Sequence, residues 1–136
     1  MNSLARYTLS KKERLKSRKL IEQLFREGQS FSVTPFRIIW MFTQSPSPVL
    51  QAGFSVSSKY FKKAVDRNRI KRQMRDAYRL QKNTLMEKLQ LEQKQLSVFF
   101  IYTGRVLPEY STLFDKTGTA LKNLIKNFHE NTAANT

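Results

Sequence analysis

Cysteine is absent from this 136-residue chain, which excludes disulfides and thiolate metal sites and fits a reducing compartment. Histidine occurs once, as His129 in a polar stretch, where it is far more often a bystander than a general base. No apolar run approaches the roughly 20 residues of a membrane span, and the basic first residues lack the apolar segment of a signal peptide. We therefore expect one domain in the cytoplasm.

Acidic residues are also few and scattered. The chain has 10 Asp+Glu, and none of them forms the close carboxylate cluster that a two-metal nuclease needs. Asp66 and Asp76 lie on an arginine-rich segment, where pairing with nearby arginines, or placement of Asp66 at a helix N-terminus, is the simpler interpretation. The four glycines form no phosphate-binding loop. We expect no catalytic residue and no metal held by the protein, so the residues favour a binding module.

Positive charge is what the chain has in excess, with 25 Lys+Arg and a formal net charge of +15. Charge of this size describes the partners of a protein rather than its fold. Nucleic acid is the leading partner. An anionic membrane surface ranks second, because the basic helix described next has no apolar face left to insert once its apolar stripe is buried in a core.

Residues 64–79 contain no glycine or proline and predict a helix with two different faces. Ile70, Met74, Ala77 and Tyr78 recur at helical spacing and form one apolar stripe. The opposite side gathers basic residues and one asparagine: Asn68, Lys71, Arg72, Arg75, Arg79 and Lys82. Like charges at this spacing cost about 0.2–0.5 kcal/mol per pair, and a bound polyanion would relieve the repulsion. The alternative, a solvated helix face, is disfavoured because almost no acids alternate with the bases.

The remaining segments predict a small α+β domain. The predicted elements are, in order, a helix over 17–27 capped by Ser17, strands over 36–43 and 49–57, the basic helix from 62 or 63 to about 90, a strand over 96–103 and a helix over 110–128. The two first strands are expected to form an antiparallel hairpin around a proline-rich turn at 45–48. Asn83-Thr84 is a weak point in the basic helix.

These elements fit a single sandwich-like domain over residues 1–136, with helices packed on a mixed sheet of about four strands. The strand over 96–103 is apolar throughout, which is typical of a strand covered on both faces. Residues 1–12 and 129–136 are polar and are expected to be flexible tails.

The basic helix also carries a resemblance to a known family. Residues 64–72, Ala-Val-Asp-Arg-Asn-Arg-Ile-Lys-Arg, followed by Arg75 and by Tyr78-Arg79, resemble the signature helix of the bacterial ribonuclease P protein family. Residues 54–57 are similar to the strand that precedes this helix in the family, and residues 14–28 resemble its N-terminal helix. The resemblance covers about residues 9–128.

The resemblance implies a single domain with a left-handed β-α-β crossover, against the right-handed rule that holds for about 98% of such units. It also implies that the protein does not cut RNA itself. The family's protein binds a catalytic RNA, which carries the Mg²⁺-dependent chemistry and holds most of the Mg²⁺, and contacts the 5′ leader of precursor tRNA. The expected particle contains one protein monomer and one RNA, and its reaction leaves the mature 5′ end of tRNA.

The resemblance implies two sets of binding residues. Contacts to the catalytic RNA are expected from Arg67, Asn68, Arg69, Lys71, Arg72, Arg75 and Arg79, since guanidinium groups bind phosphate oxygens with two parallel hydrogen bonds. A cleft for the leader is expected from Ile21, Phe25, Phe36, Trp40 and Ser55. Aromatic faces stack on unpaired bases at about 1–3 kcal/mol per base with little sequence preference. Core packing is the alternative role for Phe25, Phe36 and Trp40.

Two departures from the family pattern stand out. Ile21 occupies a position where the family often has phenylalanine, and residues 59–63 lack the usual glycine before the basic helix. Two other functions also fit the charge: a structural, ribosomal-type RNA-binding protein without a role in cleavage, and an autonomous nuclease. The scattered acids and single histidine disfavour the second of these.

Overall fold

The structure is a computed structural model that describes residues 9–44 and 49–134, with side chains up to residue 128. The elements in chain order are the 3-10 helix η1 (Lys11–Glu13), α1 (Arg18–Glu27), β1 (Gln29–Val33), β2 (Phe36–Thr43), β3 (Leu50–Val56), α2 (Ala64–Gln81), α3 (Asn83–Leu91), β4 (Gln95–Tyr102) and α4 (Tyr110–Ala134). Residues 1–8 of the tail predicted over 1–12, the predicted turn at 45–48 and the last residues 135–136 lie outside the described part.

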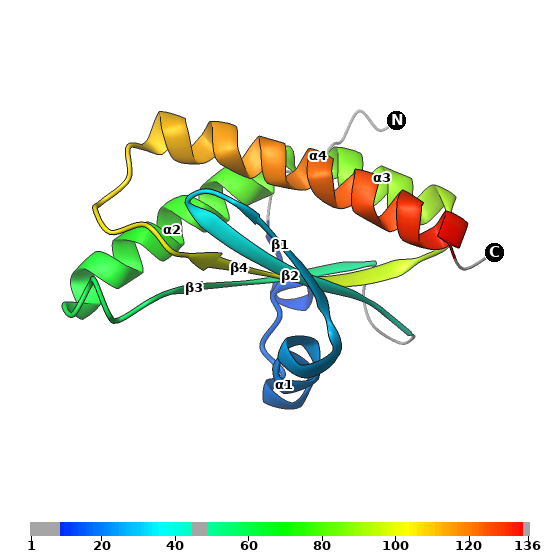
Figure 1. The fold of residues 1–136 in the computed structure, drawn as a ribbon, viewed down its shortest axis with the longest axis horizontal. Coiled ribbons are helices and arrows are strands. Elements are labelled where there is room, and N and C mark those ends of the chain that lie inside the picture. The colour runs from blue at the N-terminus through cyan, green and yellow to red at the C-terminus, as the bar shows by residue number, and fades with distance from the viewer. Residues whose placement is uncertain (1–8, 45–48, 135–136) are drawn as a thin grey trace.

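The elements form three layers (Figure 1). A four-stranded sheet in the order β1-β2-β4-β3 lies in the middle. Helix α1 covers one face of the sheet, and α2, α3 and α4 cover the other. This arrangement confirms the predicted α+β fold, with helices on a mixed sheet of four strands. None of the helices in the described residues has the length and hydropathy needed to cross a bilayer.

Strand β4 lies at the centre of the sheet, between the two strands that the sequence predicts to pair. β2 runs antiparallel to β4, with Trp40 opposite Val98. β3 runs parallel to β4, with Phe54 opposite Phe100. The predicted hairpin between β2 and β3 is therefore wrong. The central position lets helices cover both faces of the most apolar strand, and the link between β2 and β3 needs to cross only one intervening strand, about 10 Å.

The parallel strands β3 and β4 are joined through α2 and α3, which makes a β-α-β unit. This is the unit for which the family resemblance implies a left-handed crossover. The handedness stays a prediction.

Strand β1 is an element that the sequence analysis did not predict. It pairs antiparallel with β2, with Val33 opposite Phe36, around a two-residue turn at Thr34-Pro35 that contains a cis peptide bond. Its sequence signal is weak because it is a short edge strand whose apolar residues are only Phe31 and Val33. Residues 29–33 therefore read more like a loop than a strand.

The long basic helix is divided in two. Helix α2 ends at Gln81 and α3 begins at Asn83, so the break falls beside Asn83-Thr84 and confirms the predicted weak point. The predicted apolar stripe is confirmed as well, since Ile70 and Met74 are 0% and 1% exposed in the core.

The described segments next to both chain ends are more regular than expected. Helix α4 continues past the predicted end at Phe128 as far as Ala134. Near the other end, η1 at Lys11–Glu13 overlaps the last two residues of the tail predicted over 1–12, and Leu15 donates its backbone N–H to the Ala52 carbonyl on the outer side of β3. The described parts of both predicted tails thus include helical structure.

The sheet separates two apolar cores of different size. The larger lies between the sheet and α2, α3 and α4, and it contains Phe36, Trp40 and Phe100. The smaller lies under α1 and is built on Leu24 and Phe99. Alternate residues of β2 and β4 point to opposite faces of the sheet, so each strand contributes to both cores.

Candidate nucleic-acid interface

Helix α2 presents basic side chains to solvent because its apolar stripe fixes its orientation. The outward side carries five polar residues, which we call the α2 ridge: Asn68, Arg69, Lys71, Arg72 and Arg75. Arg69 and Arg72 are exposed, whereas Lys71 and Arg75 are half-buried. Among the described residues, no carboxylate lies within ion-pair distance of these four cations. This part of the predicted cationic face is confirmed.

The last two basic positions of the predicted face have partners within the chain. Arg79 Nε donates to Asp76 Oδ1 at 2.8 Å. Lys82 is only 1% exposed, and its ammonium group pairs with the Glu13 carboxylate of η1. The prediction that Lys82 belongs to the exposed face is therefore wrong. The reason is that Lys82 keeps helical backbone angles and lies one turn after the buried Tyr78, so its side chain lies at the edge of the buried stripe, where it meets Glu13 of η1.

Arg67 has a structural contact that the sequence analysis missed. Its Nη1 donates to the backbone carbonyls of Phe61 and Lys62, at 2.7 and 2.8 Å. Arg67 thereby ties the loop before α2 to the first turn of the helix. This contact anchors the loop before α2, which lacks the glycine expected at this place from the family resemblance.

The environment of Lys82 also sets two acid–base properties. Burial acts to raise the pKa of Glu13, but hydrogen bonds from Lys82 and Ser10 lower this pKa below its ordinary value of 4.5. Burial raises the pKa of Tyr78, with a further contribution from the negative charge of Glu13, so this hydroxyl stays neutral. Both groups belong to the internal structure under α2 rather than to its basic surface.

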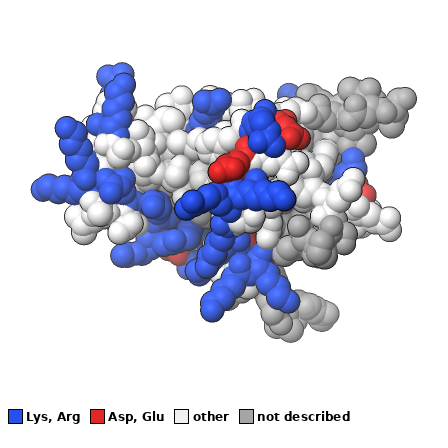
Figure 2. All heavy atoms as spheres, turned by 90° about the horizontal axis from the view of Figure 1, so that it is seen from below, with Lys and Arg blue, Asp and Glu red and all other residues white. Residues whose placement is uncertain are grey.

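Positive charge continues from α2 onto the face that carries α1. Figure 2 shows this face, on which lysine and arginine side chains cover a large area and acidic side chains are few. The exposed basic residues on α1 and on the segment before it are Arg14, Lys16, Arg18, Lys19 and Arg26. Only Arg26 is paired with a carboxylate in the described part, through Glu27 at 3.3 Å.

The same face carries an exposed aromatic side chain. Phe25 of α1 is 51% exposed, and its ring lies edge-on to the Phe99 ring of β4, with centroids 5.2 Å apart. Phe99 occupies space that opens because Gly53 has no side chain: a Cβ at Gly53 would lie 2.6 Å from the Phe99 ring. Ile21 and Ser55 are half-buried on this side of the molecule. The structure thus places three of the five predicted cleft residues on one face.

The other two predicted cleft residues lie on the opposite face of the sheet. Phe36 and Trp40 are each 1% exposed and belong to the large core under α2 and α4. Their rings pack edge-on against Phe100 and Phe42, which leaves no face for a base. The prediction that they form the floor of a leader cleft is therefore wrong. The floor under α1 is made instead by the alternate residues of β2 and β4, which include Ile39 and Phe99.

Comparison with known proteins identifies the family. A family profile described as Ribonuclease P matches residues 9–125. The chain is 38% identical over 114 residues to the ribonuclease P protein component of Porphyromonas gingivalis, covering 83% of each protein. It is 32% identical to that of Chlorobium phaeobacteroides, covering 91% of this chain and 92% of the relative. The chain belongs to the ribonuclease P protein family.

Solved structures of ribonuclease P proteins share the fold. The protein from Thermotoga maritima superposes with a TM-score of 0.64 at 23% identity, covering 82% of this chain and 96% of that one. A Staphylococcus aureus RNase P protein mutant with defective mRNA degradation activity gives a TM-score of 0.62 at 18% identity, covering 82% and 87%. At these identities the likeness establishes the fold of this chain, and nothing about its activity.

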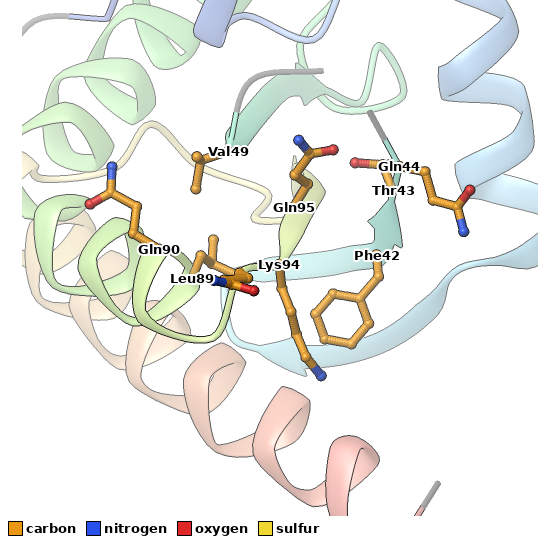
Figure 3. Close-up of a pocket in the computed structure, with 9 residues that line it drawn as sticks. Phe42, Thr43, Gln44, Val49, Leu89, Gln90, Lys94 and Gln95 are labelled. Atoms are coloured by element: carbon orange, nitrogen blue, oxygen red, sulfur yellow. The ribbon is translucent and has the colours of Figure 1, made fainter. Parts of the chain in front are cut away.

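Two further features of the described residues concern metal ligands and cavities. Within the described residues, no three His, Asp or Glu side chains come together as metal ligands. A pocket of about 720 Å³ opens at the end of the sheet where β2 finishes and β4 begins (Figure 3). There the Lys94 ammonium lies 4.7 Å from the centre of the Phe42 ring. Leu89 and Gln90 of α3 line its other side, and none of the predicted binding residues belongs to it.

Proposed function

We propose that this chain is the protein subunit of a ribonuclease P holoenzyme that removes the 5′ leader of precursor tRNA. The α2 ridge binds the catalytic RNA, and the α1 face binds the leader. The observation that carries the proposal is the set of four ridge cations without carboxylate partners in the described chain. Such cations repel each other unless a polyanion lies along them.

The proposed division of labour assigns the chemistry to the RNA. Cleavage of a phosphodiester needs metal ions or general acid–base groups in close array, and the described acids of this chain are not gathered in that way. Mg²⁺ would be held mainly by the RNA, while the protein contributes guanidinium contacts to phosphates. We expect one protein monomer per RNA, acting in the cytoplasm.

Reconstitution tests this proposal directly. The purified chain is added to the catalytic RNA of the same organism, and cleavage of a precursor tRNA is measured at low Mg²⁺ with and without protein. We expect the protein to accelerate cleavage and the protein alone to leave the substrate intact. Absence of stimulation would refute the subunit role, and cleavage by the protein alone would refute the division of labour.

The leader contact has its own test, based on Phe25. The Phe25→Ala variant removes the exposed ring, and we expect the holoenzyme to bind precursor tRNA about fivefold more weakly or worse, since stacking contributes about 1–3 kcal/mol per base. Binding of mature tRNA, which lacks the leader, should not change. Leu91→Ala is the matched control, because Leu91 is another exposed apolar residue, at the end of α3. Equal effects on both tRNAs would favour the structural, ribosomal-type alternative.

A further inference from the structure

Two loops meet at the end of the sheet where α2 begins. Strands β3 and β4 are parallel and in register, with Val56 opposite Tyr102, so the chain leaves both strands at the same edge. Residues 57–63 lead from β3 to α2, and residues 103–109 lead from β4 to α4. Figure 1 shows both loops beside the N-terminal end of α2.

Tyr60 has two cations from these loops near its ring. Its ring is 5.4 Å from the Lys59 ammonium and 5.2 Å from the Arg105 guanidinium, measured to the ring centroid. The residue is 37% exposed, and both cations are exposed. The described chain gives neither cation a carboxylate partner. Aromatic rings attract cations through the negative charge of their faces, so this cluster holds two positive charges close to one accessible ring.

The loops that carry this cluster are anchored on both sides. Phe61, next to Tyr60, is buried, and its ring lies 6.0 Å from that of Tyr102. Arg67 binds the carbonyl of Phe61, and the Tyr102 hydroxyl donates to the Val106 carbonyl at 2.7 Å. The ring is therefore presented by fixed backbone, which lowers the entropic cost of binding a ligand.

The combination suits one kind of ligand. A phosphate needs a cation, and an unpaired base needs an aromatic face; single-stranded nucleic acid supplies both at once. A base inside a duplex cannot stack on a side chain, because its faces are already covered. The cluster also adjoins the first turn of α2, whose ridge is proposed to bind the catalytic RNA.

We infer that Tyr60, with Lys59 and Arg105, binds one unpaired nucleotide of the RNA that lies along α2. The base stacks on Tyr60, and the adjoining phosphates are bound by the two cations. The inference rests on the proposed function, and it extends the interface to a loop that departs from the family pattern. It also gives Tyr60 a role distinct from that of the leader-binding Phe25 on the α1 face.

Equilibrium binding of full-length variants to the catalytic RNA of the same organism tests the stacking. We expect Tyr60→Ala to weaken binding by about fivefold to 150-fold, with the salt dependence unchanged because no phosphate contact is lost. Tyr60→Phe should bind within about twofold of wild type. Tyr110→Ala is the matched control: Tyr110 is 36% exposed, but it packs on Phe114 near the Asp76 carboxylate. Arg105→Ala should lower the log–log salt slope by about 0.7–0.9.

The outcomes separate the inference from the proposed function. Wild-type protein that neither binds the RNA nor stimulates cleavage refutes the subunit role. Wild-type protein that binds, with Tyr60→Ala equal to Tyr60→Phe or to Tyr110→Ala, refutes the stacking site alone. A photoreactive benzoylphenylalanine at position 60 gives a readout that needs no loss of binding. We expect cross-links to one unpaired nucleotide; cross-links only to duplex RNA, or none in the bound complex, would overturn the inference.

Discussion

The two ends of α2 carry the same kinds of side chain in two different states. In the ridge, Arg69 and Arg72 are exposed and have no carboxylate partner within the described chain. Towards the other end, Arg79 bonds to Asp76, and the Lys82 that follows the helix is buried against Glu13. The first half of α2 thus carries cations without a carboxylate partner in the described chain, whereas the basic residues at and just after its C-terminal end are paired within the fold.

The difference shows what decides the role of a basic residue. Helical spacing gives the direction of a side chain and can supply a partner on the same helix, as Asp76 does for Arg79. Other partners come from distant parts of the fold. Lys82 meets Glu13 because η1 is held beside β3, far from α2 in sequence. We therefore expect substitutions at the paired end of α2 to lower stability, and substitutions in the α2 ridge to weaken RNA binding.

The largest expected effect is on stability, at the paired end. Glu13→Gln keeps the shape of the side chain but leaves the buried Lys82 charge without its counter-charge. Breaking a fully buried pair costs about 3–5 kcal/mol, and we expect about 2 kcal/mol here because Glu13 is partly hydrated. The melting temperature, followed by circular dichroism, should fall by roughly 6 °C. Glu22→Gln, on the exposed side of α1, is the control. An equal fall in melting temperature for this variant would mean that the Glu13–Lys82 pair has no special role in stability.

The same pair predicts a pH dependence with a definite sign. The pKa of folded Glu13 is lowered, so the unfolded chain binds the proton more readily and stability rises with pH. The contribution of Glu13 is complete above its ordinary pKa of 4.5 and is lost as the pH falls through the lower, folded value. The difference in unfolding free energy between wild type and Glu13→Gln should be constant at neutral pH and shrink below about pH 4.5. A difference that grows on acidification would contradict this assignment.

The next effect is on RNA binding, at the ridge. Arg69→Ala combined with Arg72→Ala removes two proposed phosphate contacts and should lower the log–log salt slope by about 1.6. The affinity advantage of wild type should then shrink about ninefold between 50 and 200 mM salt. Thermal stability should stay within about 0.5 kcal/mol of wild type, since both side chains are exposed.

A charge-matched control accompanies the ridge variant. Lys122→Ala with Lys126→Ala removes two exposed cations from α4, on the other side of the molecule from α1. It lowers the net charge equally without touching α2. Equal slopes for the two double variants would mean that overall charge, and not the ridge, determines RNA binding.

The sequence predicts those parts of the fold that depend on periodicity within one segment. The stripe of Ile70 and Met74, the N-cap at Ser17 and the break near Asn83 all follow from local spacing or propensity, and the structure confirms them. Strand order is different, because the position of β4 between β2 and β3 depends on pairing between distant segments. Edge strand β1 offers too few apolar residues to be recognised alone.

The candidate site also has one part that the sequence predicts well and one part that it predicts poorly. The signature of α2 identifies its outward residues, because one periodic face suffices to place them. The α1 face brings together a helix and two strands, and the sequence alone does not say which side of β2 meets α1. Phe36 and Trp40 were assigned to the wrong side for this reason. Phe99 and Gly53 were missed because their contact joins β4 to β3.

The smallest expected effect comes from removing the carboxylate that pairs with Arg79 near the C-terminal end of α2. Asp76→Asn removes the carboxylate beside Arg79, a half-exposed pair that contributes at most about 0.5 kcal/mol to stability. Deleting a negative charge from α2 should raise affinity for the catalytic RNA about twofold in 50 mM salt, and this gain should fade at 200 mM as screening increases. Asp115→Asn, exposed on α4, should have no such effect. A tenfold loss of affinity in Asp76→Asn would instead mean that Asp76 positions Arg79 for the RNA, and the two ends of α2 would then serve one interface.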